Sequence, residues 1–235
     1  MSEDLENLVT RAKRRKRSPR WYFSLRSPYS WFAYRDLTEK YPDVLDAIEW
    51  IPYWEPDAES TRLLTEAGVD LPVRDMHRSK NFYILRDARR WAHARGWNVT
   101  WPVDRAPHWE VSHLGYLAAE EAGKGREFVR LAYRARWHEG RDLSDRATVA
   151  EIALELGLDP ALGDALDDPK IRIKGLECLI SAYHDDAFGV PFFVHGREAY
   201  WGAERVSAFA AAVRGVAWDG ESDAPFTVPE GSRSA

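Results

Sequence analysis

The spacing of apolar residues changes along the chain, and these changes predict the order of the secondary-structure elements. Trp21–Leu25 is a short apolar run that ends at Arg26-Ser27-Pro28, which is typical of a buried strand leading into a helix. Ser followed by Pro suits the N-cap and first position of that helix, which we expect to continue to about Lys40. A second strand is predicted at Ile48–Tyr53, before a Trp-Glu-Pro stop.

From about residue 57 to 183 the apolar side chains recur three and four residues apart, which indicates helices. Glycines and capping residues separate the periodic segments. We expect these helices at 81–95, 108–122, 126–139, from a Ser144 cap to Gly157, and around 176–183.

After the helical block, the pattern again predicts strands. Val190–Val194 is apolar and rich in β-formers, His195-Gly196 is predicted as a two-residue turn, and Glu198–Trp201 completes a hairpin. Pro191 opens the first of these strands and removes a ladder donor, which an edge strand tolerates. An amphipathic helix follows around 206–213.

Strands at both ends of a helical block predict an α/β domain interrupted by an all-α insertion. The expected parts are a basic flexible arm, an α/β domain in two pieces, a helical insertion domain and a flexible tail. Their ranges are 1–18; 19–56 and 184–216; 57–183; and 217–235.

The composition indicates a soluble globular protein. Of the 235 residues 45% are hydrophobic and 30% charged. No apolar run approaches 18 residues, so no membrane-spanning helix is predicted. The start of the chain lacks the apolar segment of a secretory signal, so we expect a cytoplasmic protein.

The net charge of −5 is unevenly distributed. Residues 1–20 carry a net charge of +4, so the rest of the chain carries −9. An acidic body argues against nucleic acid as a partner. The basic run is interpreted as a solvated arm.

Cys178 is the single cysteine, which excludes an intramolecular disulfide, a CxxC redox pair and a zinc ribbon. Its apolar helical context predicts an inert core thiol. His184-Asp185-Asp186 could bind a metal, but carboxylates in a loop are usually solvated. We therefore predict no metal site.

Three segments could carry chemistry. Ser27-Pro28-Tyr29-Ser30 stands at a helix start, where unpaired N–H groups and the helix dipole favour an anion. Ser27 could donate a hydrogen bond to a thiolate there, or it could simply cap the helix. The second segment is Phe188–Val194, whose Val190 backbone could pair with an extended ligand. The third is Tyr200–Arg205, in which Glu204 could complement the dipole of the last helix or hold a ligand ammonium group.

Together these segments resemble the 2-hydroxychromene-2-carboxylate isomerase family, a relative of kappa-class glutathione transferases and DsbA-type oxidoreductases. The likeness covers about residues 20–213. The matching pieces are Tyr22–Ser30, Lys80–Tyr83 with Asp87 and Trp91-Ala92, Phe188–Val194, and Trp201–Arg205.

The resemblance implies a thioredoxin-like domain with an inserted helical domain, in a homodimer. It implies that Ser27 replaces a redox cysteine as the catalytic residue and that the Val190–Pro191 peptide bond is cis. It also implies a binding site for glutathione or another low-molecular-weight thiol. Its residues would be Lys80, Val190, Pro191, Trp201, Gly202 and Glu204.

The resulting prediction is a thiol-dependent cis-trans isomerase of a conjugated carbonyl or aromatic-pathway compound. A small hydrophobic or aromatic substrate would lie between the two domains. The alternatives are a glutathione transferase, a natural-product tailoring enzyme on this scaffold, and a non-catalytic binding protein. Disulfide exchange is excluded, because neither Ser27 nor Ser30 is a cysteine.

Overall fold

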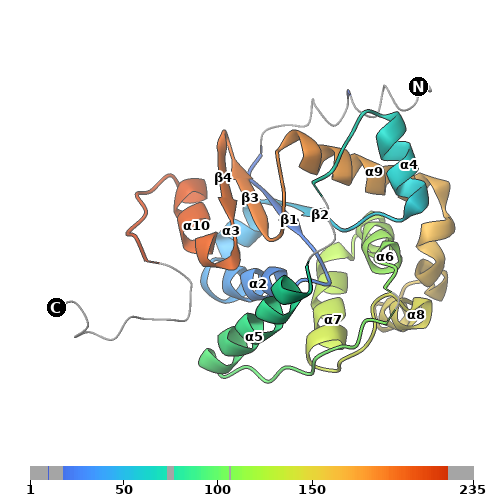
Figure 1. The fold of residues 1–235 in the computed structure, drawn as a ribbon, viewed down its shortest axis with the longest axis horizontal. Helices are drawn as coiled ribbons and strands as arrows, with labels where there is room; N and C mark the ends of the chain where they lie inside the picture. Colours follow the sequence, from blue (N-terminus) through green and yellow to red (C-terminus); the bar gives the residue numbers. More distant parts are fainter. Residues whose placement is uncertain (1–9, 11–17, 73–76, 106, 222–235) are drawn as a thin grey trace.

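The sheet is formed by four short strands drawn from the two ends of the chain. A computed structural model describes residues 10, 18–72, 77–105 and 107–221 (Figure 1). The sheet order is β2-β1-β3-β4, with β1 and β2 parallel and the other neighbouring pairs antiparallel. The strands are β1 (Arg20–Phe23), β2 (Glu49–Pro52), β3 (Phe192–His195) and β4 (Glu198–Trp201).

Helices connect and cover these strands. Helices α2 (Pro28–Lys40) and α3 (Pro42–Ala47) join β1 to β2, and η2 (Ala203–Arg205) with α10 (Val206–Arg214) follows β4. The chain between β2 and β3 is helical, and Figure 1 shows α6 to α9 gathered on one side of the sheet. This is the interrupted α/β architecture that the sequence predicts. The inserted elements are α4 (Ala58–Glu66), α5 (Arg78–Ala94), α6 (Glu110–Glu121), α7 (Gly125–Trp137), α8 (Arg146–Glu155), η1 (Pro160–Asp167) and α9 (Pro169–His184).

The hairpin is confirmed, but two of its details differ from the prediction. β3 is an inner strand, paired with β1 on one side and β4 on the other, and Pro191 precedes it, so the ladder keeps its donors. The turn is Gly196-Arg197, because His195 still pairs with Glu198. Gly196 has a φ of 62°, which glycine adopts without a steric penalty.

Two helix starts were predicted at the wrong residue. Asp145 caps α8, since its side chain accepts a hydrogen bond from the N–H of Ala147 at 3.0 Å. Ser144 does not cap the helix; its backbone N–H donates a hydrogen bond to Asp142 Oδ1 at 2.8 Å. Helix α9 begins earlier than its apolar pattern suggests, because Asp168 caps it one turn before the buried face starts.

One aromatic core joins the sheet to the helices. All four residues of β1 are buried, and the ring of Trp21 lies 5.3 Å from that of Trp50 and 6.3 Å from that of Phe193. Trp31 of α2 stacks on Trp137 of α7 at 5.8 Å. The helical insertion therefore shares its core with the sheet domain.

Cys178 is buried in α9, as predicted. Asp185, by contrast, is not a solvated loop carboxylate. It pairs with Arg20 and accepts a hydrogen bond from Tyr22, which ties the end of α9 to β1.

The predicted arm, 1–18, lies almost wholly outside the described residues. Of the predicted tail, 217–235, the structure describes 217–221. There Ser207 Oγ and Trp218 Nε1 donate to the carbonyl of Glu221 at 2.7 and 2.9 Å, so this short stretch contacts α10. No helix among the described residues has both the length and the apolar character needed to cross a membrane.

Candidate active site at the start of helix α2

Ser27 caps helix α2 directly after the turn that leaves β1. Its backbone is extended, with φ −83° and ψ 124°, and Pro28 occupies the first helical position. Its Oγ accepts a hydrogen bond from the N–H of Ser30 at 3.2 Å. The capping role is thus confirmed. The hydroxyl proton of Ser27 takes no part in that bond, so it can donate to an anion attracted by the helix start.

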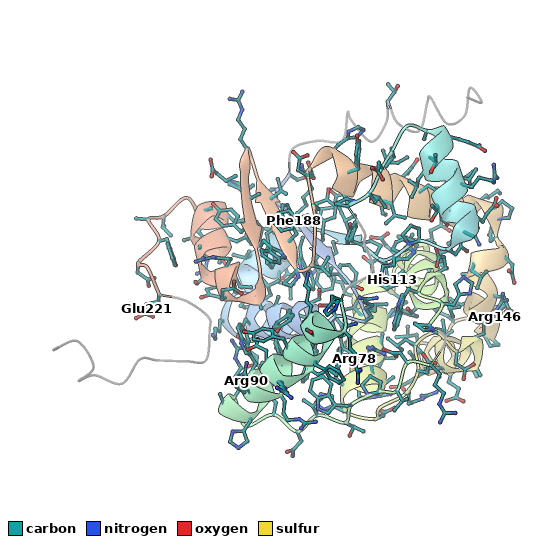
Figure 2. All side chains as sticks on the ribbon, in the orientation of Figure 1. Arg78, Arg90, His113, Arg146, Phe188 and Glu221 are labelled. Carbon is teal, nitrogen blue, oxygen red and sulfur yellow. The ribbon has the colours of Figure 1, made fainter. Side chains whose placement is uncertain are left out.

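Buried polar groups fix the turn before Ser27. The N–H of Ser24 donates to Ser30 Oγ at 3.2 Å, and the N–H of Leu25 donates to His113 Nε2 at 3.1 Å. Ser24 Oγ lies 3.2 Å from the same nitrogen. His113 comes from α6 and lies in the interior, where the insertion meets the end of β1 (Figure 2).

His113 is neutral in this position. Its Nδ1 lies 2.7 Å from the carbonyl of Trp109, to which only a protonated nitrogen can donate, so Nε2 is the acceptor for Leu25. Burial, together with the charges of Arg26 and Arg136, lowers the pKa of His113 to about 3. Its partners are distant in sequence. The only local sign of its role is a histidine on an otherwise apolar helix face.

Two arginines surround the same turn. Arg136 is buried, donates from Nε to the carbonyl of Arg26 at 3.3 Å, and holds Asp104 with two bonds of 3.0 and 2.8 Å. Arg26 pairs with Glu55. Both guanidinium groups lie over the ring of Trp109, at 5.6 Å for Arg26 and 5.0 Å for Arg136. The hydrogen bond from Arg136 therefore fixes the turn to α7, and the Arg26–Glu55 ion pair fixes it to the loop after β2.

Lys80 lies on α5, which runs beside α2 in the same direction (Figure 1). Tyr29 donates to Asp87 at 2.7 Å, and Phe32, one turn later, stacks on Trp91 at 5.4 Å. Lys80 precedes Asp87 by seven residues, about 10 Å at 1.5 Å per residue. Lys80 therefore lies beyond the N-terminal end of α2, the end that Ser27 caps, and its side chain is exposed.

The peptide bond between Val190 and Pro191 is cis. Strands β1 and β3 are antiparallel, and Tyr22 pairs with Phe192. Pro191 therefore lies opposite Phe23, and Val190 lies opposite the turn that leads to Ser27. Val190 is half-buried. The backbone of this segment is thus beside the start of α2.

The chain after β4 closes on the same segment. The N–H of Gly202 donates to the carbonyl of Pro191 at 3.0 Å, and η2 packs against α2. Gly202 has a φ of 105°, and a Cβ there would lie 2.6 Å from the carboxyl carbon of Glu204. Trp201 is half-exposed and covers Gly189, where a Cβ would lie 3.0 Å from the indole nitrogen. The positive φ of Gly202 favours glycine at that position.

The predicted site residues therefore come from four segments around the start of α2. Val190, Pro191 and Gly202 adjoin one another through the backbone, while Lys80 approaches from α5. The hydrogen bond of the Ser27 side chain runs to the N–H of Ser30, within the start of α2 itself.

Comparison with known proteins agrees with this fold. The family model of the DSBA-like thioredoxin domain matches residues 20–214. The uncharacterized protein YwbO of Bacillus subtilis is 26% identical over 169 residues, which cover 71% of this chain and 80% of that protein. The 2-hydroxychromene-2-carboxylate isomerase of Pseudomonas sp. strain C18 is 25% identical over 205 residues, which cover 86% of this chain and 92% of that enzyme.

Solved structures share the fold. A structure of 2-hydroxychromene-2-carboxylate isomerase superposes with a TM-score of 0.65 at 22% identity, covering 83% of this chain and 94% of the other. A probable DsbA oxidoreductase from Streptomyces coelicolor gives a TM-score of 0.57 at 19% identity, covering 84% of this chain and 88% of the other. These likenesses establish a DsbA-like thioredoxin fold whose sheet carries a helical insertion.

Proposed function

We propose that this chain, which belongs to the DsbA-like thioredoxin family, is a thiol-dependent cis-trans isomerase of a conjugated carbonyl compound. The thiol would be glutathione or a similar low-molecular-weight thiol. One observation carries the proposal: the Ser27 hydroxyl stands at the first turn of α2 with its proton unused by the cap. The sequence similarity to 2-hydroxychromene-2-carboxylate isomerase over most of the chain supports it.

The cysteine content argues against disulfide exchange as the reaction. Ser27 and Ser30 provide hydroxyls where a redox pair would need two thiols, and Cys178 is buried in α9. An external thiol must therefore supply the sulfur nucleophile.

The start of α2 would activate that thiol. A helix N-terminus lowers the pKa of a thiol placed against it, and a hydrogen bond from Ser27 would favour the thiolate further. The thiolate adds to the β-carbon of the conjugated carbonyl, and the π electrons move to the carbonyl oxygen. The former double bond becomes a single bond and rotates. Elimination of the thiolate restores the double bond in the other configuration, so the thiol is not consumed.

The remaining predicted residues would hold the thiol compound. The Val190 backbone groups would pair with its peptide-like part. Glu204 would bind its ammonium end, and Lys80 a carboxylate. Trp201 would cover the apolar part of the ligand beside Gly202. The substrate would then approach from the insertion side, against the turn that His113 and Arg136 hold.

The experiment combines thiol binding with turnover. We expect calorimetry to detect glutathione binding that weakens at least tenfold in Lys80→Ala and Glu204→Gln. With a cis-configured conjugated oxo acid, isomerisation should require the thiol, and Ser27→Ala should lower its rate by about 10²-fold, the effect of losing one preorganised donor.

Asp168→Ala is the matched control. Asp168 caps α9 as Ser27 caps α2, with a bond of 2.8 Å from the N–H of Lys170, but it stands on another helix. Its loss should cost similar stability and leave turnover unchanged. Isomerisation without thiol, or full activity in Ser27→Ala, would refute the proposed function. Accumulation of a stable thiol adduct would identify a transferase instead.

A further inference from the structure

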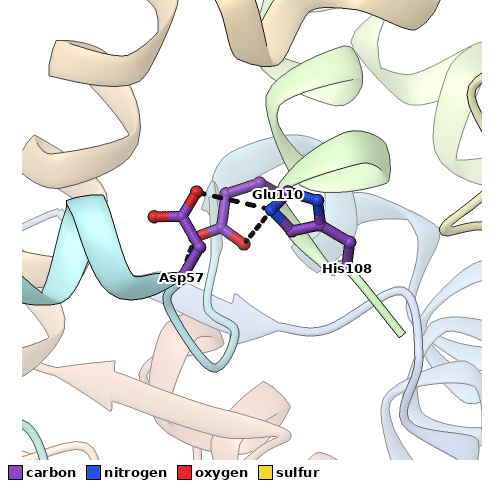
Figure 3. Close-up of side chains that lie close together, drawn as sticks. All are labelled: Asp57, His108 and Glu110. Carbon is purple, nitrogen blue, oxygen red and sulfur yellow. Dashed lines mark hydrogen bonds and ion pairs between the residues drawn. The ribbon is translucent and has the colours of Figure 1, made fainter. Parts of the chain in front are cut away.

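A second cluster of chemically active side chains joins the loop after β2 to the start of α6. Asp57, in the loop after β2, meets His108 and Glu110 at the start of α6 (Figure 3). One ligand atom from each of the three lies within 4.8 Å of the others. The proposed isomerase chemistry uses none of them.

The two distances from His108 to the carboxylates are close to those between ligands of one small cation. His108 Nε2 lies 3.4 Å from Asp57 Oδ2 and 3.7 Å from Glu110 Oε2. Zinc binds nitrogen at about 2.0–2.1 Å and carboxylate oxygen at about 2.0–2.2 Å in tetrahedral sites, which separates neighbouring ligands by roughly 3.3–3.5 Å. Figure 3 shows both carboxylates turned toward the same imidazole nitrogen. Only small side-chain movements would place all three on one ion.

Glu110 is a buried acid with one oxygen facing the cluster. Its side chain is 1% exposed, and burial raises its pKa. One oxygen, Oε1, accepts a hydrogen bond from the N–H of Asp57, whereas Oε2 faces His108 beyond hydrogen-bonding distance. A buried carboxylate is costly unless a cation or a hydrogen-bond donor compensates it. An ion between Oε2 and the imidazole would provide that compensation.

Neighbouring groups hold the Asp57 carboxylate in place, as hydrogen-bond partners commonly orient the ligands of a metal. Arg172 Nη1 lies 3.1 and 3.0 Å from the two carboxylate oxygens, and the N–H of Ser60 donates to Oδ1 at 2.7 Å. Oδ2 retains a lone pair on the side of His108. With His108 neutral, two carboxylates and one guanidinium give the cluster a formal charge of −1, which attracts a divalent cation.

We propose that Asp57, His108 and Glu110 bind a zinc ion. The imidazole favours zinc over calcium or magnesium, which prefer larger sets of oxygen ligands. His108 is 45% exposed, so the ion can enter from solvent and a water can complete the coordination. The ion would fasten the loop after β2 to α6, the helix that carries His113. The proposal is independent of the thiol chemistry.

The test uses the full-length chain without an affinity tag, treated with a chelator and dialysed. Titration with zinc against a chromophoric chelator should give one site per chain with a dissociation constant of micromolar or lower. Zinc at 100 times that constant should raise the melting temperature by roughly 5–10 °C, the shift expected for a ligand that binds only the folded state.

His108→Ala and Glu110→Gln should each weaken zinc binding at least tenfold. His108 is exposed enough for its variant to fold, and the amide oxygen introduced by Glu110→Gln can still accept from the N–H of Asp57. His93→Ala, which removes an exposed histidine of α5, should bind zinc like the wild type. No stoichiometric binding, or binding retained in both cluster variants, would overturn the proposal and leave only a hydrogen bond between the imidazole and the Asp57 carboxylate.

Discussion

Two side chains that are distant in sequence give the turn before α2 its shape. Ser27 satisfies the N–H of Ser30 and keeps its own proton, while His113 accepts from the backbone of Leu25. A buried N–H without a partner costs about 1–3 kcal/mol, so the imidazole is a positioning group for the turn. It acts in this way only when it is neutral.

Acid should destabilise the protein through His113. In the folded chain burial lowers the pKa of His113 to about 3, against 6.5 for an ordinary histidine. Between these values the unfolded chain binds more protons than the folded one. The free energy of unfolding therefore falls by up to about 1.4 kcal/mol for each pH unit below 6.5, and this loss ends near pH 3. Urea unfolding across this range measures the slope.

The variant His113→Gln isolates this contribution from that of the carboxylates. Its amide can still accept from the N–H of Leu25 but does not titrate. The variant should therefore take up about one proton fewer on unfolding, and its unfolding free energy should depend less steeply on pH. His93→Gln, at an exposed position, should keep the wild-type slope. Equal slopes in His113→Gln and the wild type would show that His113 is not buried in its neutral form.

Helix α5 depends on a few long side chains for its place beside α2. Tyr29 and Phe32 make two of these contacts, and the third is Arg95, which donates to Asp36 at 2.8 Å. The first two turns of α5 extend past α2, where Phe82 and Tyr83 are exposed. The part of α5 that carries Lys80 is thus held from one end.

Removal of the Tyr29 hydroxyl should loosen this part of α5. Tyr29→Phe loses the 2.7 Å bond to Asp87, which keeps Arg90 as a partner at 2.9 Å. A cost of about 1 kcal/mol corresponds to roughly fivefold faster hydrogen exchange of the α5 amides, because exchange follows the local opening free energy. Tyr83→Phe, exposed on the same helix, serves as the control. Unchanged exchange in Tyr29→Phe would mean that packing alone places α5.

The sequence predicts elements whose signals are local. The Ser-Pro start of α2 is confirmed, and the strand predicted at Val190–Val194 is found at Phe192–His195, because caps and short periods depend on neighbours along the chain. The Ser144 cap was wrong since Ser144 and Asp145 are both good caps, and only backbone geometry distinguishes them. The hydrogen bond from the N–H of Leu25 to His113 spans 88 residues, and no local pattern indicates it.

The site was predictable only in part for the same reason. The motifs around Ser27, Pro191 and Gly202 mark strand ends, and strand register then brings Val190 near the turn. The cluster of Asp57, His108 and Glu110 joins a loop to a helix start more than 50 residues away. Such a pairing depends on how the insertion packs against the sheet.

The described residues share one continuous core but also leave an aromatic surface uncovered. Phe188 and Trp201 are 54% and 53% exposed, and their ring centroids lie 4.9 Å apart. They stand at the open end of the β3–β4 hairpin, away from its turn. Exposed aromatic pairs are typical of interfaces. Together with the homodimer implied by the family resemblance, this predicts self-association.

Sedimentation equilibrium at micromolar concentration should therefore give about twice the chain mass of 27.0 kDa. Replacing Phe188 by Ser should shift the equilibrium toward the monomer without unfolding, because the side chain is exposed in the single chain. A wild-type mass of one chain across this concentration range would exclude a homodimer.

The pKa of the bound thiol is the most direct test of the proposed function. The absorbance of the thiolate, followed against pH in the complex with glutathione, measures it. We predict a value below the ordinary 8.5 of a thiol in the wild type, and a value about 1–2 units higher in Ser27→Ala, the effect of losing a hydrogen bond to a charged group. Asp168→Ala should match the wild type. An unshifted pKa in the wild-type complex, or the same pKa with and without the Ser27 hydroxyl, would contradict the thiolate site at the start of α2.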